Sequence, residues 1–127
     1  MADLLCIGMD DAAMQTRKLI LEKAGHAVTQ ARDLRRVKEA CEVNSFAVVI
    51  LGQSLNGSEK RRITDVVLTI CTSAKILELH KGIQPELPQA DNHLRITVSE
   101  PQDLVEAVAT LLRKPRKKKA RQGPSGC

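Results

Sequence analysis

Near the middle of the chain the sequence runs Phe46-Ala47-Val48-Val49-Ile50-Leu51, six apolar residues in succession. A run of this length that is rich in valine and isoleucine is typical of a β-strand with both faces buried. Such strands occupy the centre of parallel sheets, which are covered by helices on either side. Residues 46–51 therefore predict an α/β fold with this strand at its centre.

The segments on both sides of this strand alternate between short apolar runs and amphipathic stretches. The apolar runs predict four further strands, at residues 4–7, 26–29, 75–79 and 93–97. The amphipathic stretches predict helices that begin after Asp10 or Asp11, after Asp33, near Ser58 and near Ser99. In the third of these helices, Lys60 is predicted to lie away from the apolar face. The simplest arrangement of these elements is a three-layer, doubly wound, five-stranded parallel sheet with flavodoxin-like strand order.

The connection between the fourth and fifth strands differs from the others. Only residues 81–92 are available for it, and they include Pro85 and Pro88. Parallel strands need a crossover of about a dozen residues, so this connection is near the minimum length. We therefore expect the fourth helix to be short or absent and the connection to be mostly loop, with His80 and His93 exposed at its two ends.

The charge of the chain is unevenly distributed. The 127 residues, enough for one ordinary domain, carry 20 Lys and Arg against 15 Asp and Glu, a net charge of +5. Residues 113–127 hold seven of the basic residues and no acidic one, so residues 1–112 have a net charge of −2. The sequence predicts a folded domain at residues 1–113 and a basic, disordered tail at residues 114–127. The side chains with which this tail would bind an anionic partner are Lys114, Arg116, Lys117, Lys118, Lys119 and Arg121.

The composition excludes several classes of function. Phe46 is the only aromatic residue, so the chain lacks the stacking platforms on which single-stranded nucleic acids bind. No apolar run approaches the ~18 residues of a membrane span, and no membrane association is expected. The four cysteines are far apart, which is typical of reduced, cytosolic thiols. The histidines lack the spacing of a zinc site.

Ligands of a doubly wound sheet bind beyond the carboxyl ends of the strands, where the strand order reverses. Around these ends the sequence resembles the response-regulator receiver domain of two-component signalling, the CheY-like family. The resemblance includes the run at residues 4–7 with the acidic turn after it, and the segments at residues 21–26, 46–51 and 100–104. Their order and spacing agree with the family over residues 3–113.

The resemblance implies a particular site. In the family an aspartate after the third strand accepts a phosphoryl group, acidic residues after the first strand hold Mg²⁺, a Ser or Thr follows the fourth strand and a Lys follows the fifth. A carboxylate nucleophile beside a phosphate needs these cations to offset the negative charge. This sequence has no Ser or Thr directly after its fourth strand. Its other equivalent positions hold Gly52 as the acceptor, Gly8 and Met9 as the acidic pair with Asp10 and Asp11 adjacent, and Thr97 as the lysine.

Glycine has no atom that can be phosphorylated, so the sequence predicts a degenerate receiver domain rather than an enzyme. The expected partners are signalling proteins such as a histidine kinase or a response regulator, in a bacterial cytoplasm, with no cofactor required. Asp10 and Asp11 are weak candidates for an Mg²⁺ site, and an N-cap function explains them more simply. Two alternatives stay open: a nucleic-acid-binding accessory protein that acts through the basic tail, and a phosphoacceptor that uses a displaced carboxylate. The sequence leaves self-association undecided.

Overall fold

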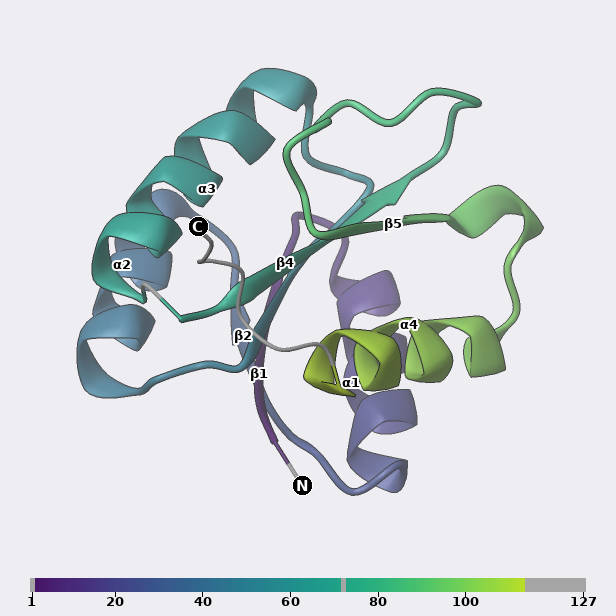
Figure 1. The fold of residues 1–127 in the computed structure, drawn as a ribbon, viewed down its shortest axis with the longest axis horizontal. Helices are drawn as coiled ribbons and strands as arrows, with labels where there is room; N and C mark the ends of the chain where they lie inside the picture. The colour runs from purple at the N-terminus through teal and green to yellow at the C-terminus, as the bar shows by residue number, and fades with distance from the viewer. Residues whose placement is uncertain (1, 72, 114–127) are drawn as a thin grey trace, which may run out of the picture.

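Five strands form one parallel sheet in the computed structural model of the chain, which describes residues 2–71 and 73–113. The predicted tail at residues 114–127 lies outside the described residues. The strand order is β2-β1-β3-β4-β5, and every neighbouring pair is parallel (Figure 1). The strands are β1 (Asp3–Ile7), β2 (Ala27–Ala31), β3 (Val48–Leu51), β4 (Lys75–His80) and β5 (Asn92–Arg95). The predicted doubly wound, five-stranded parallel sheet is confirmed.

Helices cover both faces of this sheet. The helices are α1 (Asp11–Lys23), α2 (Leu34–Val43), α3 (Gly57–Ile70) and α4 (Pro101–Arg113), with a single 3-10 turn, η1 (Ile96–Val98), before the last. α2 and α3 lie together on one face, and α1 and α4 lie together on the other (Figure 1). None of the helices in the described ranges is long and apolar enough to span a bilayer.

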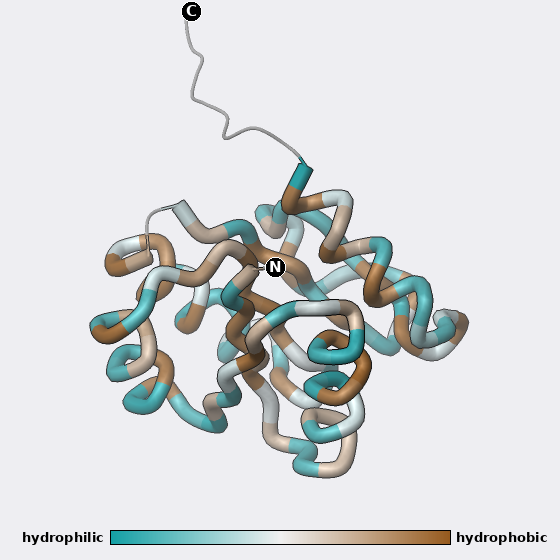
Figure 2. Tube along the Cα trace, turned by 90° about the horizontal axis from the view of Figure 1, so that it is seen from below, coloured by the Kyte–Doolittle hydropathy of each residue, from teal (hydrophilic) through white to brown (hydrophobic). Residues whose placement is uncertain are grey.

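The central strand contributes to two separate hydrophobic cores. Val49 and Leu51 belong to the core beneath α2 and α3, whereas Val48 and Ile50 belong to the core beneath α1 and α4. All four side chains are buried, as the apolar run predicted. Along the helices, hydrophobic and hydrophilic segments alternate, because each helix has one buried and one solvated side (Figure 2).

The β4–β5 connection contains no helix within residues 81–91, which confirms the prediction for the fourth crossover. The prediction for β5 is wrong at its end, because the strand stops at Arg95 and the chain then forms η1. Local side-chain bonds accompany this change. The hydroxyl of Thr97 donates to the carbonyl of Lys81 (3.2 Å) and that of Ser99 to the carbonyl of Arg95 (2.6 Å). Such bonds compete with regular strand pairing.

Candidate functional site

The carboxyl ends of β1 and β3 lie side by side at the centre of the sheet. Ile7 pairs with Leu51, so Gly8 and Gly52 follow on neighbouring strands. The amide of Gly52 donates to the carbonyl of Ile7 over 2.7 Å, and the amide of Met9 donates to the hydroxyl of Ser54 over 2.8 Å. The structure thus brings together three positions that the sequence analysis singled out, and their backbones are held by hydrogen bonds between the two loops.

Gly52 occupies a place where a side chain does not fit. A Cβ atom built on this residue would lie 2.9 Å from the carbonyl oxygen of Ile7 and 3.3 Å from Nη1 of Arg17. A Cβ essentially never approaches a backbone oxygen so closely, so any larger residue would force the two strands apart. At Gly8 the nearest atom to a built Cβ is the flexible Met14 Sδ, at 3.1 Å, so that position is less restricted.

Arg17 is the residue at this site that the sequence analysis missed. Its guanidinium extends from α1 to Gly52, and its Nη2 donates to Oε1 of Gln53. Burial lowers the pKa of Arg17, against the opposing attraction of Cys6 and Asp10, but an arginine whose ordinary pKa exceeds ~12 stays charged at neutral pH. The sequence does contain a signal for this position. Arg17 follows Ala13 by four residues and precedes Leu21 by four, so the three residues share one face of the helix.

The two aspartates beside the site have structural partners. Asp10 caps α1 by accepting a hydrogen bond from the amide of Ala13 (3.1 Å), and Asp11 forms an ion pair with Arg32 (2.9 Å). Within residues 2–71 and 73–113, no group of three or more His, Cys, Asp or Glu side chains could hold a metal ion. Both carboxylates are thus already engaged by protein groups, whereas Mg²⁺ in proteins is usually held by one or two carboxylates together with several waters.

The thiol of Cys6, which is buried on β1, is unreactive at neutral pH. Burial raises the pKa of Cys6 to about 12, although the nearby charge of Arg17 opposes the shift. A thiol with this pKa carries almost no thiolate at neutral pH, and the thiolate is the reactive form. Cys6 therefore serves packing beneath the site.

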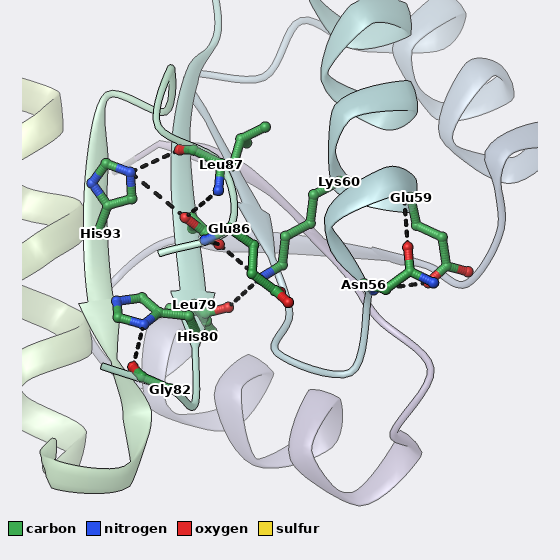
Figure 3. A network of polar contacts seen from close by, with 10 residues as sticks. Asn56, Glu59, Lys60, Leu79, His80, Gly82, Glu86, Leu87 and His93 are labelled. Atoms are coloured by element: carbon green, nitrogen blue, oxygen red, sulfur yellow. Dashed lines mark hydrogen bonds and ion pairs between the residues drawn. The ribbon is translucent and has the colours of Figure 1, made fainter. Parts of the chain in front are cut away.

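The prediction that Lys60 lies away from the apolar face of its helix is wrong, because the side chain is fully buried. Its Nζ donates to Oε2 of Glu78 (2.8 Å), the carbonyl of Leu79 (2.9 Å) and Oε1 of Glu86 (3.0 Å), as Figure 3 shows. Lys60 precedes Ile63 by three residues, a spacing that places it on the inner face of α3. The charge of Lys60 had favoured an exposed position, since a lysine is rarely buried unless an acidic group pairs with it.

Glu78 is the centre of this network. It is fully buried on β4, where Oε2 accepts from the amide of Glu86 (2.8 Å) and Oε1 from the amide of Leu87 (3.1 Å). Burial raises the pKa of Glu78, but the hydrogen bonds from Lys60 and from these two amides outweigh it, so the net shift is downward. The network therefore connects α3 and β4 to the β4–β5 loop, which contains no helix.

Both histidines that flank the loop also bind its backbone. His80 is buried, with Nδ1 2.9 Å from the carbonyl of Gly82, and His93 is half-buried, with Nε2 2.8 Å from the carbonyl of Leu87 (Figure 3). The prediction that they are exposed is wrong, because the loop folds back over them. They lie outside the group of Gly8, Met9 and Gly52.

Comparison with known proteins shows which solved structures share this fold. No family model matches the sequence, and neither does any curated protein. Among solved structures, the chain is similar to the chemotaxis response regulator CheY4 of Vibrio cholerae, at 22% identity and a TM-score of 0.76 over 88% of this chain and 99% of that chain. It is similar to a putative response regulator from Chloroflexus aurantiacus, at 22% identity and a TM-score of 0.77 over 89% of this chain and 98% of that chain.

A third similar structure is the CheY-like receiver domain protein from Methanospirillum hungatei, at 19% identity and a TM-score of 0.76 over 88% of this chain and 94% of that chain. The chain therefore has the fold of CheY-like response-regulator receiver domains. The family resemblance that the sequence analysis named is confirmed at the level of the fold.

Proposed function

We propose that this chain is a degenerate receiver domain of two-component signalling that acts by protein–protein contact, without phosphorylation of an aspartate. The observation that carries the proposal is the packing at Gly52, where even a methyl group would lie 2.9 Å from the carbonyl oxygen of Ile7. Phosphoryl transfer to a receiver needs a carboxylate nucleophile at this position. In this chain the position holds Gly52, which is in close contact with β1 and has no side chain that could act as the nucleophile.

The charge at the site supports the same proposal. Phosphorylation by the family's chemistry would need Mg²⁺ held by carboxylates beside the acceptor. Here Arg17 places a fixed positive charge next to Gly52, whereas Asp10 and Asp11 are engaged in an N-cap and an ion pair. We infer that the domain works without a cofactor and is not an enzyme.

Exposed apolar side chains support contact with a protein partner at this edge of the sheet. Met9, Ile83 and Val98 lie in the segments that follow β1, β4 and β5, so all three are at the carboxyl end of the sheet. Their exposed fractions are 50%, 76% and 70%. We propose that this edge binds a histidine kinase or a response regulator in the cytoplasm.

Incubation of the full chain with acetyl phosphate and Mg²⁺, followed by intact-mass analysis, tests the absence of phosphorylation. We expect no adduct of about 80 Da, the mass of one phosphoryl group on an acceptor carboxylate. A receiver domain with an aspartate after its third strand serves as the positive control. A stoichiometric adduct that hydroxylamine removes would show that a displaced carboxylate accepts the phosphoryl group.

Quantitative pull-down from the source organism tests the contact surface. We expect Ile83→Asp and Val98→Asp to reduce retention of kinases and response regulators identified by mass spectrometry at least ~10-fold, because a charge in a buried apolar contact is costly. Val43→Asp, at an apolar residue that is 79% exposed at the end of α2, is the matched control. Equal retention by all three variants would contradict a partner at the carboxyl edge.

A further inference from the structure

A cavity of about 410 Å³ lies between α1, the end of β5 and the beginning of α4. α1 and α4 are neighbours on the same face of the sheet, as Figure 1 also shows. Most of the cavity wall is apolar and includes Ile20, Leu94, Ile96 and Leu104. The volume lies within the range of small-molecule sites in proteins, roughly 300–1,000 Å³.

Arg17 is the only basic residue that lines this cavity within the described parts of the chain. The guanidinium has five N–H donors, and the hydrogen bond that its Nη2 makes, to Gln53, goes to a neutral amide. It forms no ion pair within residues 2–71 and 73–113, and Asp10 attracts it only from a longer distance. Glu100, which is exposed, is the one carboxylate among the residues that line the cavity. The half-buried positive charge is thus left without a close counter-ion.

We propose that this cavity binds a small organic carboxylate with an apolar body. The carboxylate would lie against Arg17, whose planar fork matches its two oxygens, and the apolar body would lie against Ile20, Leu94 and Leu104. Inorganic phosphate would lack the apolar contact, and a neutral alcohol would lack the charge. This inference is independent of the proposed absence of phosphorylation, because it depends on the cavity and not on the acceptor position.

Titration of the ¹⁵N-labelled full chain by NMR tests the proposal, with octanoate, butyrate, 1-octanol and inorganic phosphate as probes. We expect octanoate to shift amides of α1 and of the residues that precede α4. It should bind about 200-fold more tightly than butyrate, because octanoate has four more methylenes and each buried methylene contributes about fourfold. It should also bind at least ~10-fold more tightly than 1-octanol or phosphate, since each of these lacks one of the two contacts.

Two arginine variants separate the site from general charge effects. Arg17→Gln should abolish the preference for octanoate over 1-octanol, whereas Arg61→Gln should leave octanoate binding unchanged. Arg61 is exposed on α3, which covers the opposite face of the sheet. If Arg17→Gln does not fold, Ala13→Leu keeps the arginine but fills part of the cavity, and it should weaken octanoate binding at least ~10-fold.

Several results would overturn the inference. The first is the absence of amide shifts at about 10 mM octanoate, a concentration that detects a Kd in the millimolar range. The second is a set of shifts confined to other parts of the molecule. The third is equal affinity for octanoate and 1-octanol in the unmodified chain. Unchanged octanoate binding in Arg17→Gln would also exclude the assigned role of the guanidinium. None of these results would bear on the acetyl phosphate experiment.

Discussion

Gly52 lies where the end of β3 packs closely against β1. Its amide already pairs with the carbonyl of Ile7, and the strands approach so closely that a Cβ atom would be 2.9 Å from that oxygen. We expect Gly52→Ala to lower the free energy of unfolding by about 1–3 kcal/mol, the usual cost of overpacking, in a urea denaturation experiment.

The control for this prediction is Gly82→Ala in the exposed β4–β5 loop. The nearest atom to a Cβ built on Gly82 is the carbonyl oxygen of Gln84, 4.0 Å away, so this variant should change stability by no more than about 0.5 kcal/mol. Equal losses in the two variants would mean that close approach of β1 and β3 is not what requires glycine at position 52.

Lys60 gives a second prediction for a single residue. Lys60→Met should lower the free energy of unfolding by about 3–5 kcal/mol, because Glu78 would stay buried without its cation. The measurement is equilibrium urea denaturation. Arg61→Met, at an exposed neighbour on the same helix, should change stability by less than about 0.5 kcal/mol. The double variant Lys60→Met with Glu78→Leu should be more stable than Lys60→Met alone, and a double variant that is less stable would contradict this explanation.

At the scale of the element, the charge on β4 makes the stability dependent on pH. The pKa of Glu78 is lowered in the folded state, so the carboxylate stabilises the fold above its unfolded pKa of ~4.3, and this contribution is lost as the pH falls through the lower folded pKa. The difference in Tm between the unmodified chain and Glu78→Gln should therefore shrink as the pH falls from about 7 to about 3. A difference that stays constant over this range would show that Glu78 does not titrate with unfolding.

Local patterns were sufficient to predict the elements themselves. Apolar runs and caps indicated the five strands and four helices, and the two prolines indicated that the connection at residues 81–92 is mostly loop. What the patterns could not supply was the contact that holds this loop. Lys60 and Glu78 are 18 residues apart, and neither has a local feature that identifies the other as its partner. The end of β5 was misplaced because hydroxyl bonds from Thr97 and Ser99 to the backbone override strand propensity.

The candidate site was predictable only in part, for a similar reason. Gly52, the predicted equivalent of the acceptor position, was located by counting along the chain, because it directly follows the central strand. The role of Arg17 depends on how far a long side chain on α1 reaches across the end of the sheet, and this distance is set by tertiary packing. A helical spacing places Arg17 on the inner face, but it does not specify which loop the guanidinium meets.

At the scale of the whole molecule, the charge distribution gives a prediction about nucleic acid. The fragment 1–113 has 14 basic and 15 acidic residues, a net charge of −1, so we expect it not to bind duplex DNA at about 150 mM salt. Fluorescence anisotropy across a salt series, with the full chain beside the fragment, is the measurement. Any DNA binding by the full chain should disappear with residues 114–127, and equal binding by both forms would place the interaction on the folded domain.

The buried anchor of the β4–β5 loop also has a consequence for how such a sequence changes over evolutionary time. One lysine on α3 and one glutamate on β4 hold a connection whose own side chains are mostly exposed. Substitutions at exposed loop positions other than Glu86, which pairs with Lys60, therefore carry little penalty, whereas a change at Lys60 or Glu78 alone leaves a buried charge without its partner. Among descendants of this sequence, the loop should drift freely in composition, while positions 60 and 78 should be kept together or be replaced together.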